Sequence, residues 1–139
     1  MANKKRFWLG ILAMVLVLGM TVVGCDNGST GNGGNSILDT MGLSTANPNS
    51  TALNIGNITL TQFNEVKELL GGYQGWSTFD GDLNIIWTGR TQTQANQAET
   101  ALDGLSWIGG KSYGFMFNPT REEEDGLYLP AGTVWVYFY

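Results

Sequence analysis

The residue types that most often carry catalysis are scarce in this chain. Among its 139 residues there is no histidine, and Cys25 is the only cysteine. These counts exclude Ser–His and Cys–His nucleophilic centres, His/Cys zinc sites and any disulfide within the chain. Only carboxylates, lysine, tyrosine, serine and threonine remain for chemistry. We therefore expect a protein that is not an enzyme and that uses no cofactor.

One group of polar residues has a spacing known from metal sites. Asp80, Asp82 and Asn84 have the D-x-D-x-N spacing that opens an EF-hand calcium loop, but Ile85 stands where that loop needs glycine. Asp80 and Gly81 lie between two strand-like runs and both tolerate positive φ, which predicts a hairpin turn instead. We expect no metal here.

Aromatic side chains are the stronger lead to function. The chain has sixteen, most of them after residue 60. Because side chains alternate along a strand, Trp135, Tyr137 and Tyr139 share one face of the predicted strand 133–139. That face could stack on sugar rings or contact a protein, unless the strand is central and covered on both sides. Further candidates for ligand contact, in turn-rich segments, are Tyr73, Trp76 and Tyr128. Two aromatics expected in the core are Trp87 and Trp107.

The N-terminal segment has the parts of an export signal. Three basic residues at positions 4–6 precede an uncharged apolar run from Phe7 to Val23, which ends at Val22-Val23-Gly24-Cys25. This ending resembles the lipobox of bacterial lipoproteins, and the leader is similar to those of spirochaete lipoproteins. The resemblance implies a lipoprotein signal peptide over 1–24, cleavage before Cys25 and diacylglyceryl transfer to its thiol. A membrane-spanning helix and a plain secretory signal are the alternatives.

The charge left after removal of residues 1–24 bears on partners. Four basic residues then face twelve acidic ones, so 4 − 12 gives −8. An acidic surface repels phosphate backbones and anionic lipid, so we expect no nucleic acid partner, and membrane contact only through acyl chains, palmitate among them. The predicted location is the exported side of the inner or outer membrane of the cell envelope. Four consecutive acids at 122–125 predict a solvated loop, with a weak calcium site as the alternative.

Composition divides the exported part into two. Residues 25–50 begin with a stretch rich in Gly, Ser and Asn and predict a flexible tether. As an alternative for its second half, a short turn could dock on the domain through Ile37, Leu38, Met41 and Leu43. Residues 51–139 are long enough for one small domain. The loop signal Asn47-Pro48-Asn49 marks the border between them.

Within the domain, the apolar patterns predict an α+β fold: a small, mostly antiparallel sheet with two helices packed on one face. Glycine and proline clusters separate the predicted elements. These are strands at 52–60, 76–79, 82–88, 113–117 and 133–139, helices at 62–70 and 94–105, and a loop at 118–126.

Two functions fit these expectations. The first is a non-catalytic binding module, displayed on a membrane, that uses an aromatic-rich surface for a glycan or an envelope protein. The alternative is a structural or envelope-assembly component that docks permanently on a protein partner.

Overall fold

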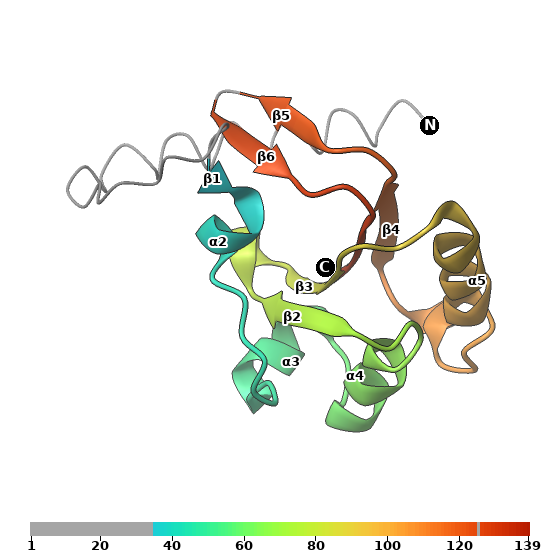
Figure 1. Ribbon diagram of the computed structural model, residues 1–139. Coiled ribbons are helices and arrows are strands. Elements are labelled where there is room, and N and C mark those ends of the chain that lie inside the picture. Colours follow the sequence, from blue (N-terminus) through green and yellow to red (C-terminus); the bar gives the residue numbers. More distant parts are fainter. Residues whose placement is uncertain (1–34, 125) are drawn as a thin grey trace.

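An antiparallel sheet organises the described part of the chain. The computed structural model describes residues 35–124 and 126–139 (Figure 1). Their elements, in chain order, are β1 (Asn35–Ser36), α2 (Ile37–Met41), α3 (Ser50–Gly56), α4 (Leu60–Lys67), β2 (Tyr73–Ser77), the 3₁₀ turn η1 (Phe79–Gly81), β3 (Leu83–Trp87), α5 (Gln92–Asp103), the 3₁₀ turn η2 (Ile108–Gly110), β4 (Tyr113–Asn118), β5 (Glu122–Glu124), β6 (Leu127–Leu129) and β7 (Thr133–Phe138).

The four strands of the main sheet lie in the order β2-β3-β7-β4, and every neighbouring pair is antiparallel. This confirms the predicted α+β class. The β2–β3 hairpin turns at Asp80 and Gly81, whose φ angles are 60° and 79°, as the Asp-Gly pair predicts. The final strand β7 is central, with β3 on one side and β4 on the other.

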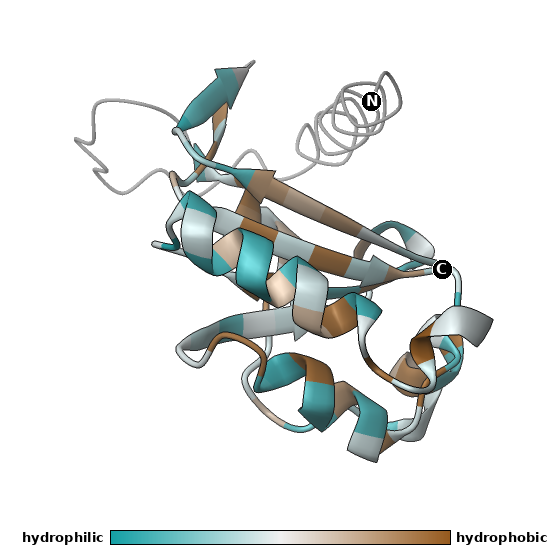
Figure 2. Cartoon of the chain, turned by 90° about the vertical axis from the view of Figure 1, so that its right-hand side faces the viewer, coloured by the Kyte–Doolittle hydropathy of each residue, from teal (hydrophilic) through white to brown (hydrophobic). Residues whose placement is uncertain are grey.

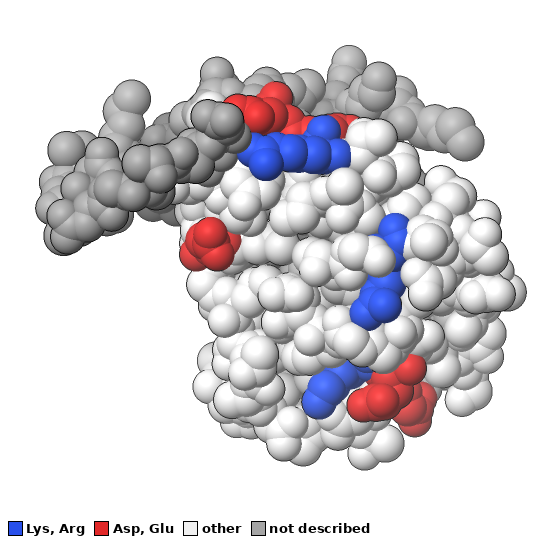
Figure 3. All heavy atoms as spheres, in the orientation of Figure 1, with Lys and Arg blue, Asp and Glu red and all other residues white. Residues whose placement is uncertain are grey.

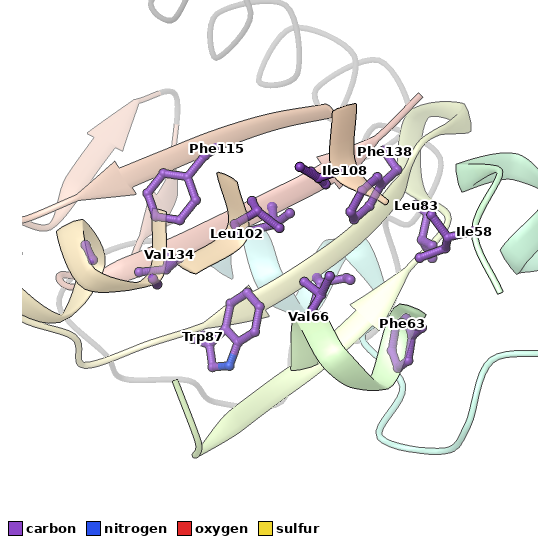
Figure 4. Packing of buried hydrophobic residues seen from close by; sticks show 14 of the residues in the cluster. Ile58, Phe63, Val66, Leu83, Trp87, Leu102, Ile108, Phe115, Val134 and Phe138 are labelled. Carbon is purple, nitrogen blue, oxygen red and sulfur yellow. The ribbon is translucent and has the colours of Figure 1, made fainter. Parts of the chain in front are cut away.

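Helices cover one face of this sheet. Trp87 and Val134, adjacent across β3 and β7, are fully buried beneath them (Figure 4). In Figure 2, α5 lies over the sheet and turns mostly neutral or hydrophilic residues outward. The helical residues that contribute to this core are Leu53 of α3, Phe63 and Val66 of α4, and Ala95, Ala98 and Leu102 of α5.

The opposite face is covered by α2 and a small second sheet. That sheet has the order β1-β6-β5, with β1 parallel to β6 and β5 antiparallel to it. Ile37, Leu38 and Met41 of α2 are buried against Ile86 and other residues of this face. The predicted tether over 25–50 is therefore wrong for residues 35–50, which belong to the folded domain together with residues 51–139. The apolar residues of α2 fold inward because the main sheet would otherwise expose an apolar face.

The predicted strand over 52–60 is also wrong, because α3 occupies most of this range. Asn49 caps α3 by accepting a hydrogen bond at 2.9 Å from the backbone N–H of Ala52, and Asn57 ends it in the left-handed region. Gly56 brings the helix close to the sheet, since a Cβ there would lie 2.7 Å from Cδ2 of Leu83. A larger residue would push α3 off the sheet.

The two predicted helices exist, and each begins two residues earlier than expected. Thr59 caps α4 and Thr91 caps α5, and in both helices the glutamine three residues later bonds back to the cap backbone. These capping boxes satisfy N–H groups that a helix start leaves unpaired.

The predicted loop over 118–126 contains a strand. Glu122–Glu124 forms β5 and pairs with β6, with Glu123 beside Tyr128. Consecutive acids therefore do not prevent pairing on this peripheral sheet, where the side chains of Glu122 and Glu123 are exposed to water.

The predicted signal peptide, the lipidation site Cys25 and tether residues 25–34 lie outside the described residues. Within 35–124 and 126–139, none of the helices has the length and apolar character needed to cross a membrane.

Candidate functional site

Trp135 is not available to a ligand, and its prediction as a contact residue is wrong. Its side chain is 0% exposed beneath α2 and β6. Its indole N–H donates to Oδ1 of Asn84 at 2.8 Å, and the amide of Asn84 donates to the carbonyls of Phe79 and Asp82. Trp135 thus belongs to the core, as expected if the strand is central. The same bonds occupy the buried amide of Asn84, which fits a hairpin turn better than a calcium loop.

Tyr137 and Tyr139 remain at the uncovered end of the same face. Their rings stack with centroids 6.0 Å apart and an angle of 29° between planes. Tyr139 is 63% exposed, whereas Tyr137 is half-buried. The backbone N–H of Tyr139 donates to the carbonyl of Ser112, which holds the end of β7 to β4. The pair therefore offers a fixed aromatic surface with one open ring.

A glycine sets the position of the inner ring. Gly114 lies directly opposite Tyr137 in the β4–β7 register. A Cβ on Gly114 would be 2.1 Å from Cζ of Tyr137, so the ring lies across the bare backbone of β4. Aromatic cover of a strand glycine restores the packing that the missing side chain would supply.

One carboxylate, that of Asp82, lies near the tyrosine pair. The β3–β7 register pairs Leu83 with Phe138, which places Asp82 opposite Tyr139 and Asp80 at the adjoining turn. Burial, and then the Asp80 carboxylate, raises the pKa of Asp82. Burial also raises the pKa of Tyr137, with further contributions from Tyr139 and Asp82. The Asp82 carboxylate is thus close enough to act on Tyr137, and nowhere in the described residues do three or more acidic groups gather into a possible metal site.

Tyr73 and Trp76 lie away from this pair. Both pack against Phe63 under α4, on the helical side of the sheet. The indole N–H of Trp76 donates to the carbonyl of Ala46 at 2.6 Å, and Nζ of Lys67 lies 5.3 Å from the centre of the Tyr73 ring. Both side chains are half-buried, so they act mainly as a wall of the core.

Tyr128 is on the small second sheet, and another side chain lies over its ring. The guanidinium of Arg121 lies 3.9 Å from the ring centre, and the same guanidinium is 3.5 Å from a carboxylate oxygen of Glu123. Of the six aromatic residues predicted to contact a ligand, only Tyr137 and Tyr139 stack directly on each other with one ring largely exposed.

Sequence reasoning missed a group of buried donors at the far end of the β2–β3 hairpin. Within the described residues, the Tyr73 hydroxyl, Nε1 of Trp87 and Nε of Arg90 are buried without a hydrogen-bond partner. Nη2 of Arg90 does donate to the carbonyls of Gly71 and Gly72, at 2.6 and 3.0 Å. No motif marks this cluster, since its members meet only through strand pairing.

Comparison with family models, with curated proteins and with solved structures finds no match for this chain.

Proposed function

We propose that this protein is an exported, lipid-anchored binding module without catalytic activity, and that it binds a neutral or cationic sugar at Tyr137 and Tyr139. One observation carries the ligand assignment: a stacked tyrosine pair with an open outer ring and the Asp82 carboxylate near its inner ring. The apolar face of a sugar stacks on an aromatic ring, and its hydroxyls or ammonium groups donate to carboxylates.

The anchor rests on the leader. The basic residues, the apolar run and Val22-Val23-Gly24-Cys25 support lipidation of Cys25 and retention on the exported side of the inner or outer membrane. The acidic composition supports contact with the bilayer through acyl chains alone and argues against nucleic acid. On the face seen in Figure 3, Lys and Arg form no continuous patch.

The binding experiment uses the full-length processed protein in detergent, tested against immobilised neutral, amino and acidic glycans and then by calorimetry with the best binder. Tyr139→Ala should weaken binding about 2- to 13-fold, since aromatic stacking contributes roughly 0.5–1.5 kcal/mol. Tyr128→Ala, which removes an aromatic ring on the other sheet, is the matched control. Trp135→Ala is unsuitable because Trp135 is buried.

The alternative is a structural or envelope-assembly component. A stoichiometric protein partner recovered from solubilised envelope, together with no glycan binding by the parent protein, would replace the binding-module proposal with this one.

The anchor has its own test. Cys25→Ser should block lipidation, so that the precursor accumulates and its processed form is absent from the detergent phase. Normal processing of this variant would refute the lipobox assignment.

A further inference from the structure

The two outer edges of the main sheet differ. The edge of β2 is closed by an earlier segment of the chain, because Ser44 and Trp76 exchange backbone hydrogen bonds of 2.8 and 3.0 Å. Leu43 lies against Gly75 at the same edge, where a Cβ would be 2.8 Å from that of Leu43. This edge cannot accept another strand without displacing residues 43–46.

Within residues 35–124 and 126–139, no strand pairs with the outer edge of β4. The backbone N–H of Tyr139 donates to Ser112, and that of Gly132 donates to Asn118, so even-numbered residues turn their carbonyls toward β7. In an antiparallel ladder the alternate residues, Tyr113, Phe115 and Phe117, turn their N–H and C=O groups outward.

No described strand pairs with this side of β4, which is the outermost strand of the sheet in Figure 2. Natural edge strands are commonly protected by charge, proline or a bulge. Residues 113–118 contain neither a charged residue nor proline, and they pair with β7 in unbroken register.

The strand is complementary to itself. Antiparallel pairing of two β4 strands about Phe115 sets Phe115 against its own copy and Tyr113 against Phe117. All three positions have outward backbone groups, so three pairs with two bonds each give six main-chain hydrogen bonds. The aromatic side chains of these positions lie on the helical side of the sheet, where cross-strand aromatic pairs are favourable.

The other face of the strand also fits a second copy. The same register sets Met116 of one copy beside Gly114 of the other, a long side chain beside a residue with none. Met116 would then reach the ring of Tyr137, which covers Gly114. A flexible thioether beside an aromatic ring is a favourable contact. An unrelated peptide would form the main-chain hydrogen bonds but would lack the fit of the Met116 side chain beside Gly114.

We propose that two copies of the chain associate by antiparallel pairing of their β4 strands about Phe115, which joins the two four-stranded sheets into one of eight strands. The helices of both copies then lie on one side of the joined sheet and both tyrosine pairs on the other. The proposal does not depend on the sugar ligand. Because the copies are acidic, added salt should strengthen their association.

The first test measures distance. The full-length processed protein carries a spin label at Ser112→Cys, an exposed position just before β4. The proposed register separates the two copies of residue 112 by six residues along the strand direction, about 20 Å between backbones at roughly 3.3 Å per residue. The pairing is supported if the measured distance distribution is centred near this value, allowing for the length of the two spin-label side chains. A monomeric mass at all concentrations, or a distance far outside this range, overturns it.

The second test uses proline. Phe117→Pro removes an outward N–H, a change that an edge strand tolerates, and should raise the dimer dissociation constant at least tenfold while the monomer stays folded. Met116→Pro removes an N–H that faces β7 and should instead unfold the monomer. If Phe117→Pro keeps the fold by near-ultraviolet circular dichroism and leaves the dissociation constant unchanged, the proposal fails. Should it unfold, the distance measurement still decides.

Discussion

The contact between Gly114 and Tyr137 allows a prediction with opposing contributions. Replacing a strand glycine by alanine ordinarily stabilises a protein by roughly 0.5–1 kcal/mol, because glycine loses more backbone freedom on folding. Here the new methyl group would overlap a ring whose Cζ lies 2.1 Å from the added Cβ. Displacing that ring, which is half-buried and stacked on Tyr139, is an overpacking cost of about 1–3 kcal/mol. We expect Gly114→Ala to lower the free energy of unfolding by about 1–2 kcal/mol.

A double-mutant cycle isolates the cause. In a Tyr137→Ala background the obstacle is gone, so Gly114→Ala should become neutral or stabilising by roughly 0.5–1 kcal/mol. Urea unfolding followed by tryptophan fluorescence measures each free energy. Gly109→Ala is the control, since nothing lies within 4 Å of a Cβ at that position, and it should not destabilise the protein.

An equal loss of unfolding free energy for Gly114→Ala in both backgrounds would refute an overlap with Tyr137. Such additivity would mean that the ring does not lie on the glycine. If the coupling is present, Gly114→Ala should also weaken binding of a sugar at the tyrosine pair, because it moves the inner ring of the stack.

Three further predictions concern buried polar groups and pH. Tyr73→Phe should raise the free energy of unfolding by about 1 kcal/mol, because it removes a buried hydroxyl that has no partner among the described residues; a loss of similar size in urea unfolding would contradict this. Asn84→Ala should lower the free energy of unfolding by about 2–3 kcal/mol, since it leaves the buried indole N–H of Trp135 without its acceptor. The control Gln74→Ala removes an exposed hydrogen bond and should change the free energy of unfolding by less than about 0.5 kcal/mol. Asp82 has a raised pKa in the folded state, so the folded protein binds this proton more tightly than the unfolded chain does, and its contribution to stability falls as pH rises through the titration. As pH rises from 3 to 7, the free energy of unfolding of Asp82→Asn should therefore increase relative to that of the parent protein. A difference in unfolding free energy that stays constant across that range would exclude the effect.

Local signals predicted the elements that form through neighbouring residues. The alternation in β7, the Asp-Gly turn and the stripe containing Phe63 and Val66 all act over a few residues, and each is confirmed. The helix starts shifted by two residues because several threonines could serve as the cap, and only the glutamine three residues after the true cap distinguishes them.

The exposure of the aromatic residues could not be predicted in the same way. Trp135 is buried because α2 and β6, which are far apart in the sequence, meet over it. The two-residue parallel pairing of β1 with β6 has no pattern of its own. The polar residues ahead of Ile37 predicted a tether, and no local pattern showed that the apolar residues of α2 pack on the main sheet. Tyr139 stays exposed since it follows the end of β7 and is not among the residues that pack with α2 and β6.

The way the chain enters the domain has a mechanical consequence. Any tension reaching Asn35 loads the short β1–β6 pairing first, where the N–H of Asn35 donates to Gly126 at 3.0 Å. The load then passes to α2, well before it reaches the main sheet, which begins at Tyr73. Peeling of β1 and α2 would uncover Trp135 while β3, β7 and β4 remain paired. A pull on the N-terminal side would thus be converted into an exposed apolar face before the rest of the domain yields.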